Sequence, residues 1–252
     1  PYRVHTDLPK RDRKWLESLL ADMIAIRRAY AQAFPEPSDA KPPVSVIRVF
    51  ADPAAYRAYA GEGLEGSAGH FSSLNRELVV MGDAEEESNK RRRDEIRSIA
   101  FHEGFHQYLF LITPPLAAVP TWFNEGHATY FETFRVRGGA AKPTLSPRLE
   151  IARRATGLRS AEGLARLLAY SQETFYAQAN DCYAVAWLLV HWLRTEAPPD
   201  LAKTLDAYYA LIREGKSQLE ANQAVYPPQT LARIAEGLDA YLGKHAWEPP
   251  RD

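Results

Sequence analysis

Two histidines and a glutamate in the segment HEGFH have the types and spacing that bind and use a metal ion. His102 and His106 stand four residues apart, so on a helix they share one face and can bind the same ion, a geometry that suits zinc. Glu103 follows the first histidine, where a carboxylate can take a proton from water and pass it to a leaving group. The pattern alone also fits two hydrogen-bonded histidines on an ordinary helix, so a third ligand is its test.

Glu125 is the candidate third ligand. Eighteen residues lie between His106 and Glu125. The gap contains Pro114 and Pro115, which end the first helix and allow a second one to return to the metal. Catalytic zinc usually keeps three protein ligands and one open position. The sequence therefore predicts one Zn²⁺ ion, held by these two glutamate and histidine side chains together with His102.

The segments HEGFH and WFNEGHATYFE, at this spacing, resemble the gluzincin metallopeptidases, above all the aminopeptidase N type with its NEG-x-A helix. More weakly, YRVHTDL and CYAVAWLLVHWL resemble bacterial peptidase-MA-like proteins. The resemblance implies a zinc metallopeptidase in which His102, His106 and Glu125 bind the metal and Glu103 is the general base. It also implies an α+β, zincin-like (thermolysin-like) fold: a small N-terminal mixed sheet, a central metal helix and an all-helical C-terminal lobe.

The same resemblance assigns helpers to the site. Tyr183 matches the tyrosine that opens a Tyr-x-x-x-Trp helix, and we expect it to donate to the oxyanion, with Tyr176 as the second candidate. Either tyrosine is also compatible with a core position. Asn124 either fixes the turn before the third ligand or is a helix N-cap. Thr129 or Glu132, one and two turns beyond Glu125, could bind the second nitrogen of a ligand histidine; Glu132 could equally be solvated.

One departure from the aminopeptidase N pattern bears on specificity. The Gly-x-Met-Glu-Asn segment that holds a substrate's amino terminus there is missing, and NRELVVMGD stands in its region. Glu77 could replace it as an amine anchor, although an exposed strand glutamate is the simpler interpretation. We therefore prefer an endopeptidase. Leu74–Met81 is expected to be the edge strand that pairs with a peptide or protein substrate.

Three alternatives remain open at this point: an aminopeptidase, a zinc-bound peptide-binding module with little turnover, and a hydrolase of a non-peptide amide or ester. The intact Glu103 argues against the binding module, because a base is needed only for turnover. The remaining histidines and the cysteine are expected to stand outside the chemistry. His70 is expected in a loop, His127 on the far side of its helix, and His191 and Cys182 in the core.

The lobe that positions these residues is expected over 1–112. Its elements are a strand at Tyr2–Thr6, a helix with an apolar stripe from Trp15 to Phe34, a strand at Val44–Phe50, a short helix capped by Asp52, a hairpin at His70–Met81 and the metal helix from Asp94 to Ile112.

The second lobe is expected over 113–252 and to be helical, the two lobes forming one catalytic unit. Its first helix begins near Thr121 and is expected to be closed by Gly138 and Gly139. The later helices are expected over Leu164–Tyr170, Thr174–Leu193, Leu201–Ile212 and Leu231–Leu242, with a further one capped by Ser217 and Glu220.

Composition limits the partners. A net charge of −1 predicts neither nucleic acid nor an anionic membrane, and the basic run Lys90–Arg93 is neutralised by Glu85–Glu87, Asp94 and Glu95. No run of about 18 apolar residues exists to form an integral membrane segment. Because the chain opens on Pro1, and because of the resemblance, we expect an extracytoplasmic location in a bacterial periplasm or outside the cell. The sequence carries no indication of oligomeric state.

Overall fold

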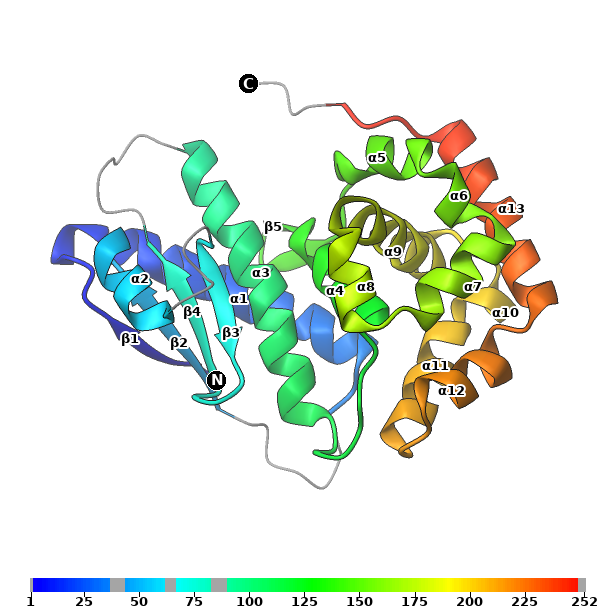
Figure 1. Cartoon of the computed structure of the whole chain (residues 1–252). Coiled ribbons are helices and arrows are strands. Elements are labelled where there is room, and N and C mark those ends of the chain that lie inside the picture. The colour runs from blue at the N-terminus through cyan, green and yellow to red at the C-terminus, as the bar shows by residue number, and fades with distance from the viewer. Residues whose placement is uncertain (1, 37–43, 62–66, 83–89, 249–252) are drawn as a thin grey trace. The chain divides into compact units, whose positions relative to one another are not determined.

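The computed structural model describes residues 2–36, 44–61, 67–82 and 90–248, with side chains described from residue 93 onward in the last range. The chain is largely helical with a small mixed sheet, which confirms the expected α+β class (Figure 1). No helix in these ranges is long and apolar enough to cross a membrane. Glu85–Glu87, expected to neutralise the basic run, lie outside the described residues.

The elements follow the chain in two groups. The first comprises β1 (Tyr2–Thr6), η1 (Lys10–Asp12), α1 (Arg13–Ala33), β2 (Ser45–Phe50), α2 (Pro53–Ala60), β3 (Gly69–Ser72), β4 (Glu77–Met81) and α3 (Lys90–Ile112). The second comprises α4 (Thr121–Glu132), β5 (Arg135–Arg137), β6 (Ala140–Lys142), α5 (Arg148–Arg154), α6 (Thr156–Arg159), α7 (Ala161–Ala169), α8 (Gln172–Ala177), α9 (Ala179–Thr195), α10 (Pro199–Ala202), α11 (Thr204–Arg213), α12 (Gln218–Val225) and α13 (Pro228–Lys244).

The main sheet has the strand order β1-β2-β4-β3. β1, β2 and β4 run parallel, and β3 pairs antiparallel with β4. β4 therefore lies between two strands, and both of its edges are occupied. The expectation that Leu74–Met81 is the edge strand is wrong: the edge on this side of the sheet is β3, and α3 packs beside it.

Helices cover both faces of this sheet. On one face, Leu78 of β4 lies near Gly104 of α3, as do Met23 and Tyr30 of α1. The next residue of the strand points the other way, and Val79 packs with Tyr56 of α2 in a second apolar cluster. The metal helix is thus held between a long helix and the sheet, while α2 stabilises the opposite face.

Local sequence explains several of these elements. The apolar stripe expected in α1 is buried from Trp15 to Tyr30. Asp52 caps α2, accepting from the N–H groups of Ala54 and Ala55 at 3.0 and 3.2 Å. The capping box predicted for Ser217 and Glu220 is present at the start of α12. These short-range expectations are confirmed because their determinants lie within one turn of the chain.

Two expectations about helices are wrong. Gly138 and Gly139 do not close α4, which ends at Glu132; both have positive φ, 57° and 75°, and form the turn of the β5–β6 hairpin. The segment Thr174–Leu193 is two helices rather than one, because the chain leaves helical geometry at Gln178, with φ −121° and ψ 33°.

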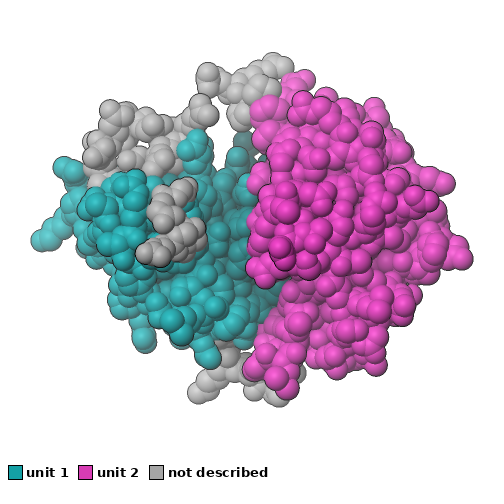
Figure 2. All heavy atoms as spheres, in the orientation of Figure 1, with its two compact units in different colours: residues 1–112, 131–144 teal, residues 113–130, 145–252 magenta. Residues whose placement is uncertain are grey.

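Contacts divide the chain into two compact units, coloured separately in Figure 2. The first contains residues 1–112 and 131–144, so that the β5–β6 hairpin belongs with the sheet and packs on α1. The second contains residues 113–130 and 145–252. In it α9 is a central helix, with Ala184–Leu193 buried along its length and α5, α6, α8 and α13 packed around it.

Two glycines of α13 offer a matched test of that packing. A Cβ on Gly237 would lie 2.2 Å from a ring carbon of Trp192, whereas no described atom lies within 4 Å of a Cβ on Gly243. We expect Gly237→Ala to lower the free energy of unfolding by about 1–3 kcal/mol through overpacking. Gly243→Ala should raise it by up to about 1 kcal/mol through helix propensity. Urea denaturation followed by circular dichroism measures both; equal stabilities would contradict the packing of α13 on α9.

Candidate metal centre

The two histidines of HEGFH lie one turn apart on α3, as their spacing predicts. Their ring centroids are 4.8 Å apart and the rings are inclined at 77°. Both side chains are half-buried, whereas Phe101 and Phe105, each directly before one of them, are buried in the core. Tyr30 of α1 fixes this turn by donating its hydroxyl to the carbonyl oxygen of Phe101 at 2.5 Å. The helix thus places its apolar face in the core and leaves the imidazoles accessible.

Glu132 orients the first histidine. Its Oε2 lies 3.1 Å from Nδ1 of His102. An ionised carboxylate can only accept a hydrogen bond, so Nδ1 carries the proton and the lone pair of Nε2 is left to bind a metal. Of the two groups that the sequence offered for this role, Glu132 takes it. Thr129 instead donates its hydroxyl to the main-chain oxygen of Glu125, one turn earlier on α4.

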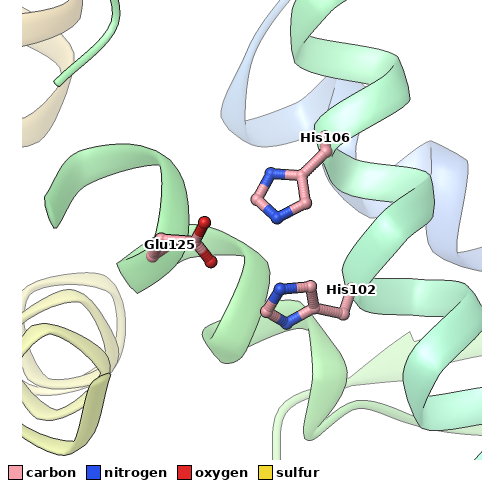
Figure 3. Close-up of side chains that lie close together, drawn as sticks. All are labelled: His102, His106 and Glu125. Carbon is pink, nitrogen blue, oxygen red and sulfur yellow. The ribbon is translucent and has the colours of Figure 1, made fainter. Parts of the chain in front are cut away.

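Glu125 completes a group of three ligands. Each of His102, His106 and Glu125 offers one ligand atom, and these atoms lie within 4.8 Å of one another (Figure 3). A tetrahedral zinc ion with bonds of about 2.0–2.2 Å needs its ligand atoms roughly 3.3–3.6 Å apart, a separation that small side-chain rotations reach. Glu125 is only 6% exposed, and buried carboxylates in proteins are paired or coordinate metals. Two imidazoles and a carboxylate are therefore a donor set that fits zinc.

A tyrosine hydroxyl contacts this third ligand. Tyr176 of α8 donates to Oε1 of Glu125 at 2.8 Å. Burial, followed by the nearby Glu125 carboxylate, raises the pKa of Tyr176 well above its ordinary value, so the group remains a neutral donor. Tyr183 of α9 is half-buried beside it, with the two ring centroids 6.4 Å apart. Of the two predicted oxyanion donors, the second candidate is the one whose hydroxyl reaches a predicted ligand.

Glu103 stands apart from the three ligands and contacts the edge strand. Its Oε2 accepts a hydrogen bond from the main-chain N–H of Phe71 on β3 at 2.9 Å. Donation by an N–H group favours the ionised carboxylate. This bond leaves Oε1 as the oxygen that can take up a proton. Spacing within HEGFH explains why Glu103 is not a ligand, but nothing in the sequence pointed to Phe71 as its partner.

Glu77 does not serve the site. Arg48 pairs with both of its oxygens, at 2.9 and 3.0 Å, and Tyr59 of α2 donates a further hydrogen bond at 2.7 Å. The hydrogen bonds from Arg48 lower the pKa of Glu77. The carboxylate is half-buried and faces α2, the side of the sheet opposite α3. The interpretations as an amine anchor and as a simple exposed glutamate are both wrong.

Two further assignments near the site need correction. Asn124 is not an N-cap, because it lies in the first turn of α4 and its N–H donates to the carbonyl of Pro120 at 3.0 Å. His70 is not in a loop but on β3, where Nδ1 lies 3.2 Å from the hydroxyl of Tyr56. Burial lowers the pKa of His70, so the ring is neutral.

The remaining candidates are core residues, as the sequence predicts. His127 is fully buried and Nδ1 lies 2.8 Å from the carbonyl oxygen of Phe123. Burial lowers the pKa of His191 to about 4. Burial of Cys182, and then the carboxylate of Asp181, raise the pKa of the thiol to about 11, so it is no nucleophile.

Two glycines that the sequence reading left without a role allow close packing beside the site. Gly104 follows Glu103, and a Cβ there would lie 2.8 Å from the end of Met23. Gly126 follows Glu125, and a Cβ there would lie 3.0 Å from the main-chain oxygen of Ala186 on α9. The signal was visible in HEGFH and NEGHA, since each functional glutamate is followed by the residue that lets its helix approach a neighbour.

The comparisons with known proteins give one similarity. The profile of a family described as "Protein of unknown function (DUF1570)" matches residues 96–212. The matched segment contains all three predicted ligands, Glu103, and both tyrosines. It covers less than half of the chain. No curated protein matches the chain.

Proposed function

We propose that this chain is a zinc-dependent peptidase of gluzincin type, with a zincin-like fold, that hydrolyses peptide bonds in peptides or proteins. The observation that carries the proposal is the grouping of His102, His106 and Glu125 within 4.8 Å, with Glu103 next in sequence to one of them. A structural zinc site has four protein ligands, whereas a set of three leaves a position for water or substrate. The half-buried state of both histidines supports such an open position.

The metal and the base have separate tasks. A zinc ion held by these three residues would polarise the scissile carbonyl and lower the pKa of a coordinated water. Glu103 accepts the proton of the attacking water on Oε1 and passes it to the nitrogen of the leaving amine. Its Oε2 stays on the N–H of Phe71, which holds the carboxylate in one orientation throughout.

Tyr176 is the better candidate for the donor to the developing oxyanion. Peptide hydrolysis needs such a donor because charge builds up on the carbonyl oxygen. The hydroxyl of Tyr176 lies 2.8 Å from a predicted ligand atom and is kept protonated by its raised pKa. Tyr183 can support Tyr176 through the adjacent ring.

An endopeptidase remains the preferred subclass. The residue that could have held a free amino terminus, Glu77, is paired with Arg48 and faces α2. The free edge of β3 offers main-chain groups to an extended chain beside Glu103, and this kind of pairing does not require a chain end. Hydrolysis of a non-peptide amide or ester uses the same groups, and a binding module lacks turnover altogether.

The base is tested by Glu103→Gln. We expect this variant to keep one zinc per chain and to lose peptide hydrolysis by a factor of about 10²–10⁴, because the amide cannot accept the proton. Zinc content is measured by elemental analysis and turnover by mass spectrometry of a peptide library. Glu95→Gln, an exposed position on the same helix, is the matched control and should leave both unchanged. Full zinc without any turnover in the parent chain would favour the binding module.

The ligand set predicts a graded loss of metal. Glu125→Ala should lose stoichiometric zinc, because it removes one of three ligands. Glu132→Gln should lower zinc affinity only about 10–100-fold, because it removes the group that orients His102. Competition with a chromogenic chelator measures both. Tight zinc in Glu125→Ala would remove this residue from the ligand set.

The two tyrosines are separated by removing each hydroxyl. Tyr176→Phe should lower kcat by about 10²–10³ with a smaller effect on KM, the signature of a lost oxyanion donor. Tyr183→Phe should have the smaller effect on kcat. Steady-state kinetics on one cleaved peptide gives both values, with zinc content checked in each variant. The opposite order would return the role to Tyr183.

A further inference from the structure

Two aromatic rings of the first unit stand together beside the predicted base. Phe71 of β3 and Phe110 of α3 have ring centroids 5.3 Å apart, with their planes inclined at 57°. Phe71 is half-buried, and Phe110 is 43% exposed although its neighbour Leu109 is buried. A large ring left in solvent next to a second ring offers apolar surface that nothing in the core requires.

Helix geometry places Phe110 next to the metal ligands. It follows His106 by four residues and His102 by eight, so the three side chains share one face of α3. Helical side chains lean toward the N-terminus of their helix, so Phe110 extends back over the turn that carries His106. The exposed ring therefore continues the line of the imidazoles.

A main-chain contact fixes Phe71 against the base. Met81 donates to the carbonyl of Ala68 at 2.8 Å, and this register directs the N–H and C=O of Phe71 away from β4. The N–H binds Glu103 at 2.9 Å. The carbonyl oxygen of Phe71 thus lies on the free edge of the sheet. The Phe71 side chain pairs with Leu78 on the α3 face, so its ring and its edge-facing carbonyl meet at the same place.

We propose that Phe71 and Phe110 form a subsite for a large apolar side chain, preferably aromatic, of an extended peptide that pairs with the free edge of β3. The inference rests on the proposed function and names its substrate class. The occupant is a peptide because the apolar surface is continuous with unpaired strand edge. Burial of the exposed part of Phe110 against another ring favours apolar over charged side chains.

The position of the subsite limits the cleavage site. An extended chain advances about 3.3 Å per residue. Phe71 N lies 2.9 Å from the oxygen of Glu103, so a side chain on these rings belongs to a residue within about two positions of the scissile bond. Cleavage products should therefore carry a large apolar residue near one new end.

Peptide binding to the full chain in EDTA tests the subsite independently of turnover. Two fluorescent octapeptides are used, identical except for a central Phe or Ala, and their dissociation constants are measured by fluorescence anisotropy. We expect the Phe peptide to bind about tenfold more tightly. Phe110→Ala should remove this preference and Phe110→Leu should keep part of it. Leu74→Ala, a 91% exposed residue of the β3–β4 turn, is the control and should keep all of it.

Equal binding of the two peptides, or a full preference in Phe110→Ala, would overturn the subsite. The zinc-loaded chain is then given the same peptides, and mass spectrometry maps the products. A preference in binding without any cleavage leaves the subsite standing and contradicts the proposed function. Cleavage without any preference between the peptides contradicts the subsite and leaves the proposed function standing.

Discussion

The packing of α3 against α1 and the sheet is the constraint on which the rest of the structure depends. One face of the helix must fit against Met23, Tyr30 and Leu78, and Gly104 supplies the clearance. Because an α-helix has 3.6 residues per turn, this contact also determines where the other side chains point. His102 and His106 emerge along one line, and Glu103 turns to the edge strand. A change of register in this packing would move all of the chemistry together.

Polar groups around the helix then refine what packing alone leaves loose. A carboxylate on Nδ1 of His102 sets the tautomer, and a hydroxyl on Glu125 orients a buried charge. The main chain of β3 holds Glu103. Each of these contacts joins residues at least 30 positions apart in sequence. The site therefore depends on tertiary structure even though its central motif is five residues long.

This difference in range explains how much could be predicted from the sequence. The Asp52 cap, the capping box before α12 and the metal helix depend on neighbours within a turn, and all three were predictable. The identity of the edge strand was not, since it depends on which strand pairs with β4. The break at Gln178 was hidden because apolar periodicity continues across it. At Gly138 and Gly139 the hairpin signal was present, but we interpreted the pair as a helix end.

The candidate site divides in the same way. The three ligands followed from residue type and spacing, whereas the choice of Glu132 over Thr129, and the contact of Tyr176 with Glu125, needed the fold. The central claim is that these three ligands hold one zinc ion. X-ray absorption at the zinc K-edge of the purified chain tests it most directly. The account predicts one zinc per chain, with two imidazole nitrogens and only oxygen besides at about 2.0–2.2 Å. A chain that retains no zinc, or a coordination shell with fewer than two imidazoles, would contradict it.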